Sequence, residues 1–186
     1  MKIVADTNRV KFSFQKYCSI MISVTPRNDL IGISEIRFVE NFDHPKSDHS
    51  ALAHYLEGET GKKSVINFHI PNIIVTDKIP EYVFESFPEI AGLFLSEIFF
   101  HEVGHHAHRF QRHSVKKNKA EKFADSYAKA GYFNYLKNRR SKILNSYLFG
   151  SLNFFTFNKK ERAMFKKNRQ DLIAWLNENT EGIGFP

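Results

Sequence analysis

Cysteine is nearly absent from this chain of 186 residues, in which Cys18 is the single copy. One thiol cannot close a disulfide within the chain, and it cannot supply the several thiolates of a cysteine-based structural zinc site. Low cysteine usage is also typical of proteins that remain in a reducing compartment. We therefore expect a cytoplasmic protein whose fold is held by its core and not by disulfides.

Long hydrophobic runs are also missing. The first ten residues carry a charged or polar side chain at five positions, so they do not resemble a secretory signal. The most apolar stretch, residues 90–100, is interrupted by Glu97 and falls well short of the roughly 20 residues that a membrane-spanning helix needs. The sequence therefore predicts a soluble protein that has no membrane partner.

The composition that remains is that of a globular domain. Hydrophobic residues make up 42% of the chain and charged residues 25%, and there are 19 phenylalanines. So many large apolar side chains exclude a disordered chain, which is poor in them. Because no linker-like run or internal repeat is present, we expect one domain at residues 1–137 and a basic, aromatic, mainly helical extension at 138–186 that packs on it.

The first part of the chain predicts one helix followed by strands. A helix cap at Asp6 or Thr7 and a stop at Pro26 enclose apolar side chains that recur at spacings of three and four. These apolar positions are Val10, Phe14, Tyr17, Met21 and Val24. Two β-rich runs follow at 31–39 and 64–77, and we interpret the proline within the second run as a bulge or turn.

Polar segments separate the remaining predicted elements. Loops at 41–50 and 58–63 divide the strands of a small twisted sheet that we expect between residues 32 and 77. The pattern is then helical, with one helix at 89–113 and, after a polar turn, a second helix at 118–138. The order of helix, strands and helices predicts an α+β fold rather than a doubly wound α/β fold, with the helix at 89–113 packed on the sheet.

Residues 101–105 read HEVGH, an HExxH motif within the helix at 89–113. On a helix, two histidines four positions apart are offset by about 40° and 6 Å, so His101 and His105 can bind one tetrahedral metal ion from the same face. Glu102 projects beside them, where its carboxylate can take a proton from metal-bound water. The motif therefore predicts a zinc centre with Glu102 as general base.

A third protein ligand must come from elsewhere in the chain. His108 and His113 share the helix, but His108 already lies about 10.5 Å beyond His101 along the axis, so the three residues cannot share one ion. The metzincin pattern would need glycine at position 108 and histidine at position 111, where this chain has His108 and Gln111. No role is predicted for His106, His108 and His113 beyond the helix surface or the surroundings of the ligands.

Two acids on the second helix are better placed. Glu121 and Asp125 are four apart and share a face, on which Ala124 and Ala128 are small enough to let the two helices approach closely. This pattern predicts Glu121 as the third ligand, water as the fourth, and Asp125 as the acceptor of a hydrogen bond from a ligating histidine. A local alternative is that Asn118 and Glu121 form a capping box, which needs no metal.

The run HEVGHH followed by EKFADSYA resembles the gluzincin branch of the zincin metallopeptidases, and the short gap between the two motifs is similar to that of compact ImmA/IrrE-like minimal zincins. The resemblance covers residues 10–137, in which PRNDLIGISEIRFVEN and AHYLEGETGKKSVINFHI look like the strands of a minimal zincin sheet. It implies a zinc-dependent peptidase that acts on a peptide or protein substrate. It also implies three zinc ligands, a general base and a hydrogen-bonding acid, which map in that order onto His101, His105 and Glu121, onto Glu102, and onto Asp125.

The predicted sheet also suggests how a substrate would bind. We expect strand Ser64–Ile70 to lie nearest the active site. An extended peptide can add to the edge of such a strand through main-chain hydrogen bonds. This would place a scissile carbonyl near the metal.

Two alternatives to a peptidase stay open. Residues 109–169 hold 17 Lys and Arg residues against three acids, a balance of +14, and this phenylalanine-containing region is a candidate surface for nucleic acid. Nucleic-acid binding is not favoured, because amphipathic helices that pack their apolar side chains on the core give the same pattern. The second alternative is a zincin-like protein that binds zinc without turnover and acts through a protein or nucleic-acid partner.

Overall fold

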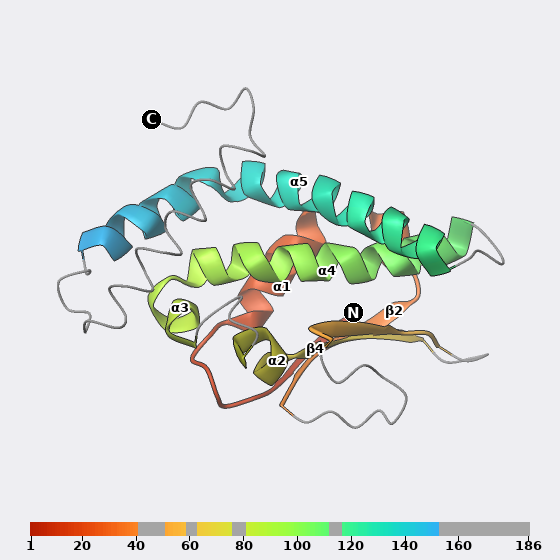
Figure 1. Ribbon diagram of the computed structural model, residues 1–186, viewed down its shortest axis with the longest axis horizontal. Coiled ribbons are helices and arrows are strands. Elements are labelled where there is room, and N and C mark those ends of the chain that lie inside the picture. Colours follow the sequence, from red (N-terminus) through yellow and green to blue (C-terminus); the bar gives the residue numbers. More distant parts are fainter. Residues whose placement is uncertain (41–50, 59–62, 76–80, 112–116, 153–186) are drawn as a thin grey trace. The chain divides into compact units, whose positions relative to one another are not determined.

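The structure is a computed structural model that describes residues 1–40, 51–58, 63–75, 81–111 and 117–152 (Figure 1). Some sequence-based predictions lie wholly or partly outside these described residues. They are the loops at 41–50 and 58–63, the turn at 114–118, His113, and the parts of the basic region and of the predicted extension beyond residue 152.

The chain divides into two compact units, Met1–Tyr147 and Leu148–Pro186. Helix α5 (Lys117–Leu152) passes through residue 138, so the prediction that the second helix ends there is wrong. No proline or paired glycine interrupts the chain at this point, and the buried side chain of Ile143 continues the helical pattern. The compact unit that contains the sheet and the HExxH motif therefore extends to Tyr147.

Four strands form one sheet in the order β1-β2-β4-β3. β1 (Lys2–Asp6) pairs in parallel with β2 (Ile33–Val39), and β2 pairs in parallel with β4 (Ser64–His69). β3 (Ala53–Leu56) pairs with β4 in the antiparallel direction. β1 and β3 are therefore the two edge strands, and the combination of this sheet with helices confirms the predicted α+β class.

One face of the sheet forms part of the core. Ile36 and Phe38 of β2 and Ile66 and Phe68 of β4 are fully buried, whereas Arg37 is exposed. Successive side chains of a strand point to opposite faces, so this alternation is what a sheet with one apolar face requires. The sheet thus offers one apolar surface to the helices.

The chain begins with a strand, so the predicted order, with a helix first, is wrong. Helix α1 (Phe14–Val24) starts later than the predicted cap at Asp6 or Thr7. The Thr7 hydroxyl instead donates a hydrogen bond to a carboxylate oxygen of Glu40, 2.7 Å away, and the backbone N–H groups of the next two residues donate to the same oxygen. Because Glu40 is 33 residues away in the sequence, the local helical pattern could not reveal this contact.

Helix α1 ends before Pro26, as the sequence predicts, because proline has no backbone N–H to continue the ladder. A short 3-10 helix, η1 (Arg27–Leu30), follows. Gly32 then takes a φ of 95°, in the left-handed region that glycine adopts without strain. This turn leads the chain into β2, and Ile31 directly precedes Gly32.

Residues after β4 form helices and not a continued strand. α2 (Ile70–Val75) follows β4 directly, and α3 (Glu81–Ser86) comes next. The prediction of a strand that continues to residue 77 is therefore wrong. A short apolar run fits a buried strand or a buried helix equally well, and Pro71 is tolerated in the first turn of α2, where its missing N–H would have no helical partner.

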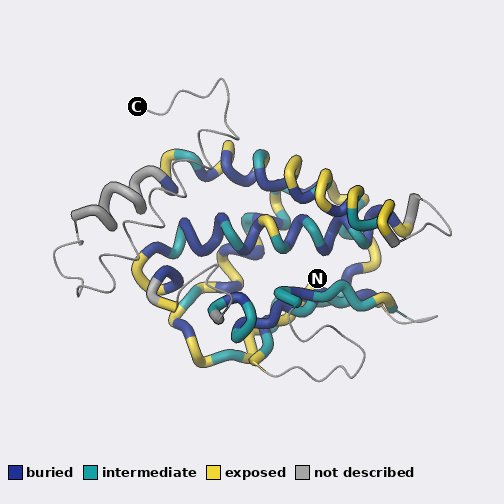
Figure 2. Tube along the Cα trace, in the orientation of Figure 1, coloured by how far each residue is buried: buried dark blue, intermediate teal, exposed yellow. Residues whose placement is uncertain are grey.

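Helix α4 (Pro88–Gln111) carries the HExxH motif and agrees with the helix predicted at 89–113 over the described residues. Proline suits its first position because no N–H is needed there. α4 packs against β3 and α1 and runs antiparallel to α5 (Figure 1). Figure 2 shows α4 buried over most of its length and α5 exposed on its outer side.

No helix in the described part of the chain combines the length and the apolar character that crossing a membrane requires.

Helices α4 and α5 approach each other closely where small residues meet. A β-carbon at Gly104 would lie 2.8 Å from the Cα atom of Ala124, which is fully buried. Glycine is therefore needed at position 104 for this backbone separation. Farther along the pair, Gly131 of α5 faces the ring of Phe100 in the same way. The small residues predicted on the second helix thus do meet the HExxH helix.

A nearly buried ion pair joins the other end of these two helices. Arg139 of α5 donates hydrogen bonds to both carboxylate oxygens of Glu89 in α4, at 2.6 and 2.7 Å from Nη2 and at 3.1 Å from Nε. The hydroxyl of Tyr17 in α1 donates to the same carboxylate at 3.0 Å. Loss of Glu89 would leave the buried Arg139 guanidinium without this carboxylate, which is strongly destabilising. The pair therefore holds three helices in one arrangement.

We predict that Gly104→Ala destabilises the protein although alanine is the better helix former. The added methyl group must push two helix backbones apart, and over-packing of this kind costs about 1–3 kcal/mol, against roughly 1 kcal/mol gained in helix propensity. The free energy of unfolding in a urea titration should therefore fall. Lys129→Ala, on the exposed side of α5, is the control and should change it by less than about 0.5 kcal/mol. A Gly104→Ala protein more stable than wild type would show that α4 and α5 can accommodate a methyl group at position 104.

Candidate metal centre

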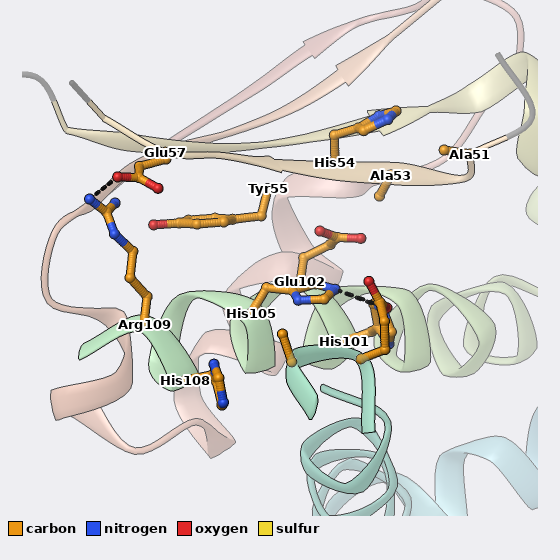
Figure 3. Close-up of a pocket in the computed structure, with 12 residues that line it drawn as sticks. Ala51, Ala53, His54, Tyr55, Glu57, His101, Glu102, His105, His108 and Arg109 are labelled. Carbon is orange, nitrogen blue, oxygen red and sulfur yellow. Dashed lines mark hydrogen bonds and ion pairs between the residues drawn. The ribbon is translucent and has the colours of Figure 1, made fainter. Parts of the chain in front are cut away.

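Three of the predicted site residues converge on one point. His101 and His105 project from the second half of α4 (Figure 3), and Glu121 projects from the start of α5. One ligand atom of each residue lies within 4.8 Å of the other two. The Nε2 atoms of the two histidines are 3.0 Å apart, and the Oε2 atom of Glu121 is 3.6 Å from His101 Nε2 and 3.5 Å from His105 Nε2. The structure thus brings the three predicted ligands together.

These separations fit a zinc ion. Zinc binds histidine nitrogen and carboxylate oxygen at about 2.0–2.2 Å, and two ligands of a regular tetrahedron are about 1.6 bond lengths apart, which gives about 3.3–3.6 Å. The two separations that involve Glu121, 3.5 and 3.6 Å, lie in this range, and the 3.0 Å between the histidine nitrogens is about 0.3 Å shorter. Two imidazoles and one carboxylate are also the donor set of catalytic zinc sites that keep one position open. The residues present can therefore hold zinc, whose identity as the metal remains a prediction.

Asp125 lies beside the first histidine. Its Oδ1 atom is 3.2 Å from the Nδ1 atom of His101. A proton on Nδ1 would be donated to this carboxylate, which leaves Nε2 with its lone pair for a metal. Asp125 is therefore placed to accept a hydrogen bond from His101, as the sequence predicts.

The capping alternative for Glu121 loses support. Asn118 lies inside α5, whereas an N-cap residue must precede the helix.

Glu102 faces the sheet side of the site and is only 7% exposed. Its carboxylate accepts a hydrogen bond from the backbone N–H of Tyr55 in β3. Burial, with a smaller contribution from the negative charge of Glu121, raises the pKa of Glu102 to about 7, although the Tyr55 N–H acts in the opposite direction. Glu102 is therefore a carboxyl group that can exchange a proton near neutral pH.

His105 keeps its neutral form over a wider pH range than a free imidazole does. Burial, and after it the nearby ring of His101, lower the pKa of His105. A neutral imidazole is the form that binds a metal ion. The packing of α4 therefore favours the ligand form of this side chain.

A cavity of about 640 Å³ contains the site (Figure 3). β3 and the residues next to it form one wall, the HExxH part of α4 forms the other, and the start of α5 contributes Ala120 and Glu121. Its volume is within the range of pockets that bind small ligands or a few residues of a peptide. The group formed by His101, His105 and Glu121 and the buried carboxylate of Glu102 thus line the same cavity.

The strand beside the site is β3, so the prediction that strand 64–70 lies nearest is wrong. That segment forms β4, an inner strand that has β2 on one side and β3 on the other and therefore no free edge. The carbonyl of Leu52 accepts a hydrogen bond from the N–H of His69, so the alternate residues Ala53 and Tyr55 direct their main-chain groups away from β4. Both of these residues line the cavity, and β3 therefore offers it a free edge.

His106 holds the site together in a way that the sequence did not reveal. Its Nε2 atom lies 2.8 Å from the carbonyl oxygen of Ile31, which can only accept, so Nε2 carries the proton. Nδ1 then accepts a hydrogen bond from the Tyr55 hydroxyl, and the Tyr55 oxygen accepts one from the Ser64 hydroxyl, both at 2.8 Å. These hydrogen bonds connect α4 to β3 and β4 next to Glu102. The partners of His106 are 51 and 75 residues away, so no local signal could have identified them.

His108 packs the two helices together. It is buried against Phe123 of α5, with 5.0 Å between the ring centroids. It is not part of the ligand cluster found among the described residues, which agrees with the helix-rise argument against it.

We predict that Glu121→Ala lowers the affinity for zinc more than Asp125→Ala does. The first change deletes a ligand, whereas Asp125 orients His101 and should affect affinity by about 10- to 100-fold, nearer the lower value because its side chain is 70% exposed. Competition with a chromophoric chelator measures both affinities. Lys122→Ala, exposed between these acids, is the control and should bind zinc like wild type. If Glu121→Ala keeps the wild-type affinity, another residue supplies the third ligand.

Comparisons of the chain with protein-family models, with curated proteins and with solved structures find no match.

Proposed function

We propose that this protein is a zinc-dependent metallopeptidase, a hydrolase that cleaves peptide bonds. The observation that carries the proposal is the convergence of His101, His105 and Glu121 on one point, with the buried carboxylate of Glu102 beside them in the same cavity. Three protein ligands leave one position for water or substrate, as in catalytic rather than structural zinc sites. The resemblance of HEVGHH and EKFADSYA to minimal zincins supports the same function.

The chemistry is divided between a metal and the protein's own side chains. Zinc at this site would supply Lewis acidity, which lowers the pKa of water to about 7 and polarises a substrate carbonyl. The Glu102 carboxylate accepts a proton from the attacking water and returns it to the leaving amine. Because burial raises the pKa of Glu102 to about 7, both of its protonation states are accessible near neutral pH. The Asp125 carboxylate orients the His101 ring.

An extended peptide is the substrate that best fits the cavity wall. A peptide that adds to the free edge of β3 can form main-chain hydrogen bonds with Ala53 and with the carbonyl of Tyr55. The N–H of Tyr55 is already bound to Glu102, so the strand edge and the proposed general base are in direct contact. A peptide bound along this edge would therefore present its backbone to Glu102.

We predict that Glu102→Gln retains zinc and abolishes turnover. Glutamine keeps the size of the side chain and can hydrogen-bond, but it cannot accept the proton of the attacking water. His101→Ala should lose both zinc and turnover, because it deletes a ligand. Elemental analysis gives the zinc content, and a library of internally quenched peptides with a chelator-treated sample gives the turnover that depends on metal.

Glu97→Gln is the matched control, since Glu97 is an exposed acid on the same helix. It should retain both zinc and turnover. The peptidase assignment fails if zinc-loaded wild type cleaves no member of a broad library, or if Glu102→Gln cleaves as fast as wild type. The zinc-binding protein that acts through a protein or nucleic-acid partner is then the better account.

A further inference from the structure

One end of the cavity holds an ion pair that the proposed chemistry does not use. Arg109, in the last turn of α4, contacts the carboxylate of Glu57, which follows β3. Both residues line the cavity, and Figure 3 shows the pair at the opposite end of the site from His101. The pair therefore bridges the two walls between which a peptide is proposed to bind.

Arg109 lies on the same side of α4 as the two histidine ligands. It is four residues after His105 and eight after His101, a spacing that keeps all three within an arc of about 80°. The rise of the helix puts the Cα atom of Arg109 about 6 Å beyond that of His105. One or two residues of an extended chain, at about 3.3 Å each, cover that distance. A guanidinium group thus stands within reach of a substrate residue close to the scissile bond.

Another carboxylate can replace Glu57 at Arg109 at little cost in free energy. The two side chains are 45% and 57% exposed, and exposed ion pairs contribute at most about 1 kcal/mol. Among the described residues, Glu57 is the ion-pair partner of Arg109, and the contact uses the Nη2 nitrogen. The guanidinium has further N–H donors in a planar fork that matches a carboxylate. A second carboxylate can therefore bind beside Glu57 or replace it.

Three acids and one basic side chain are among the described residues that line the cavity. Among the described residues that line it, Arg109 is the one Lys or Arg side chain. Of the lining acids, Glu102 and Glu121 are assigned to the general base and to the metal. Arg109 is therefore the charged group that remains on the helix wall to contact a substrate side chain or terminus.

We propose that Arg109 recognises a carboxylate of the peptide, so that the site selects peptides with a carboxylate one or two residues from the scissile bond. This inference rests on the proposed peptidase function. The carboxylate belongs either to the C-terminus of the peptide or to an Asp or Glu side chain. Both sources present the same chemistry to the guanidinium, and the experiment distinguishes them.

Binding to a protein without turnover tests the proposal. The zinc-loaded Glu102→Gln protein is titrated with dye-labelled peptides that carry Glu, Gln or Lys at each of two positions on either side of the central bond, and fluorescence anisotropy gives the dissociation constant. Each peptide is made with a free and with an amidated C-terminus. We expect Glu to bind about tenfold tighter than Gln at one position, or the free C-terminus to bind tighter than the amide by a similar factor. The difference should shrink at high ionic strength because the site is partly exposed.

Substitutions at the ion pair assign this preference to one residue. In the same background, Arg109→Gln should remove the discrimination between carboxylate and amide, and Arg109→Glu should reverse it in favour of lysine. Glu57→Gln should strengthen the preference for a carboxylate, because it removes the internal competitor. Arg37, which is as exposed as Arg109, pairs with Glu35 outside the cavity, and the control Arg37→Gln should keep the original preference. None of these changes should alter zinc affinity.

The proposal is overturned if Glu and Gln peptides, and free and amidated peptides, bind equally, or if no peptide binds. It is also overturned if Arg109→Gln keeps the preference, or if lysine peptides bind best, which would assign recognition to Glu57. Failure of the peptidase function gives a different result. In that case zinc-loaded wild type cleaves nothing, while the preference for a carboxylate persists and depends on Arg109.

Discussion

The site depends on how closely α4 and α5 approach each other. At Gly104 and Ala124 the two helix backbones lie so near that a β-carbon on the glycine would stand 2.8 Å from the opposite Cα atom. Glu121 lies three residues before Ala124, so this separation determines how far its carboxylate reaches towards the two histidines. Close-packed interiors resist such changes of spacing. The buried contact of Glu89 with Arg139 holds the same two helices farther along, so the ligand geometry follows from backbone packing.

Burial of α4 also determines the chemistry of its polar side chains. It raises the pKa of Glu102 and lowers the pKa of His105, which favours a proton-exchanging carboxyl group and a neutral imidazole in the same place. Buried polar groups are destabilising unless they are hydrogen-bonded. Tyr55 supplies two such hydrogen bonds, because its N–H donates to Glu102 and its hydroxyl donates to His106. β3 is therefore both the wall of the cavity and the support that positions α4.

Local patterns predicted the helical part of the site, and they failed where distant segments pair. The relative placement of His101 and His105 follows from helix geometry alone, and small residues on α5 indicated a close helix contact. The sheet was predicted less well, because β1 and β3 take their places through pairings that no local pattern encodes. Residues 70–75 show the same limit, since a short apolar run does not distinguish strand from helix. The role of His106 was not predicted, because its partner Tyr55 is 51 residues away in the sequence.

We propose that two helices bring three side chains onto one zinc ion. The most direct test is the zinc content per chain, by elemental analysis after dialysis, of the wild-type protein and of His101→Ala, with circular dichroism to show that both are folded. The account predicts one zinc ion per wild-type chain and none in the variant. A folded wild type that retains no zinc, or a variant that retains as much zinc as wild type, would contradict it.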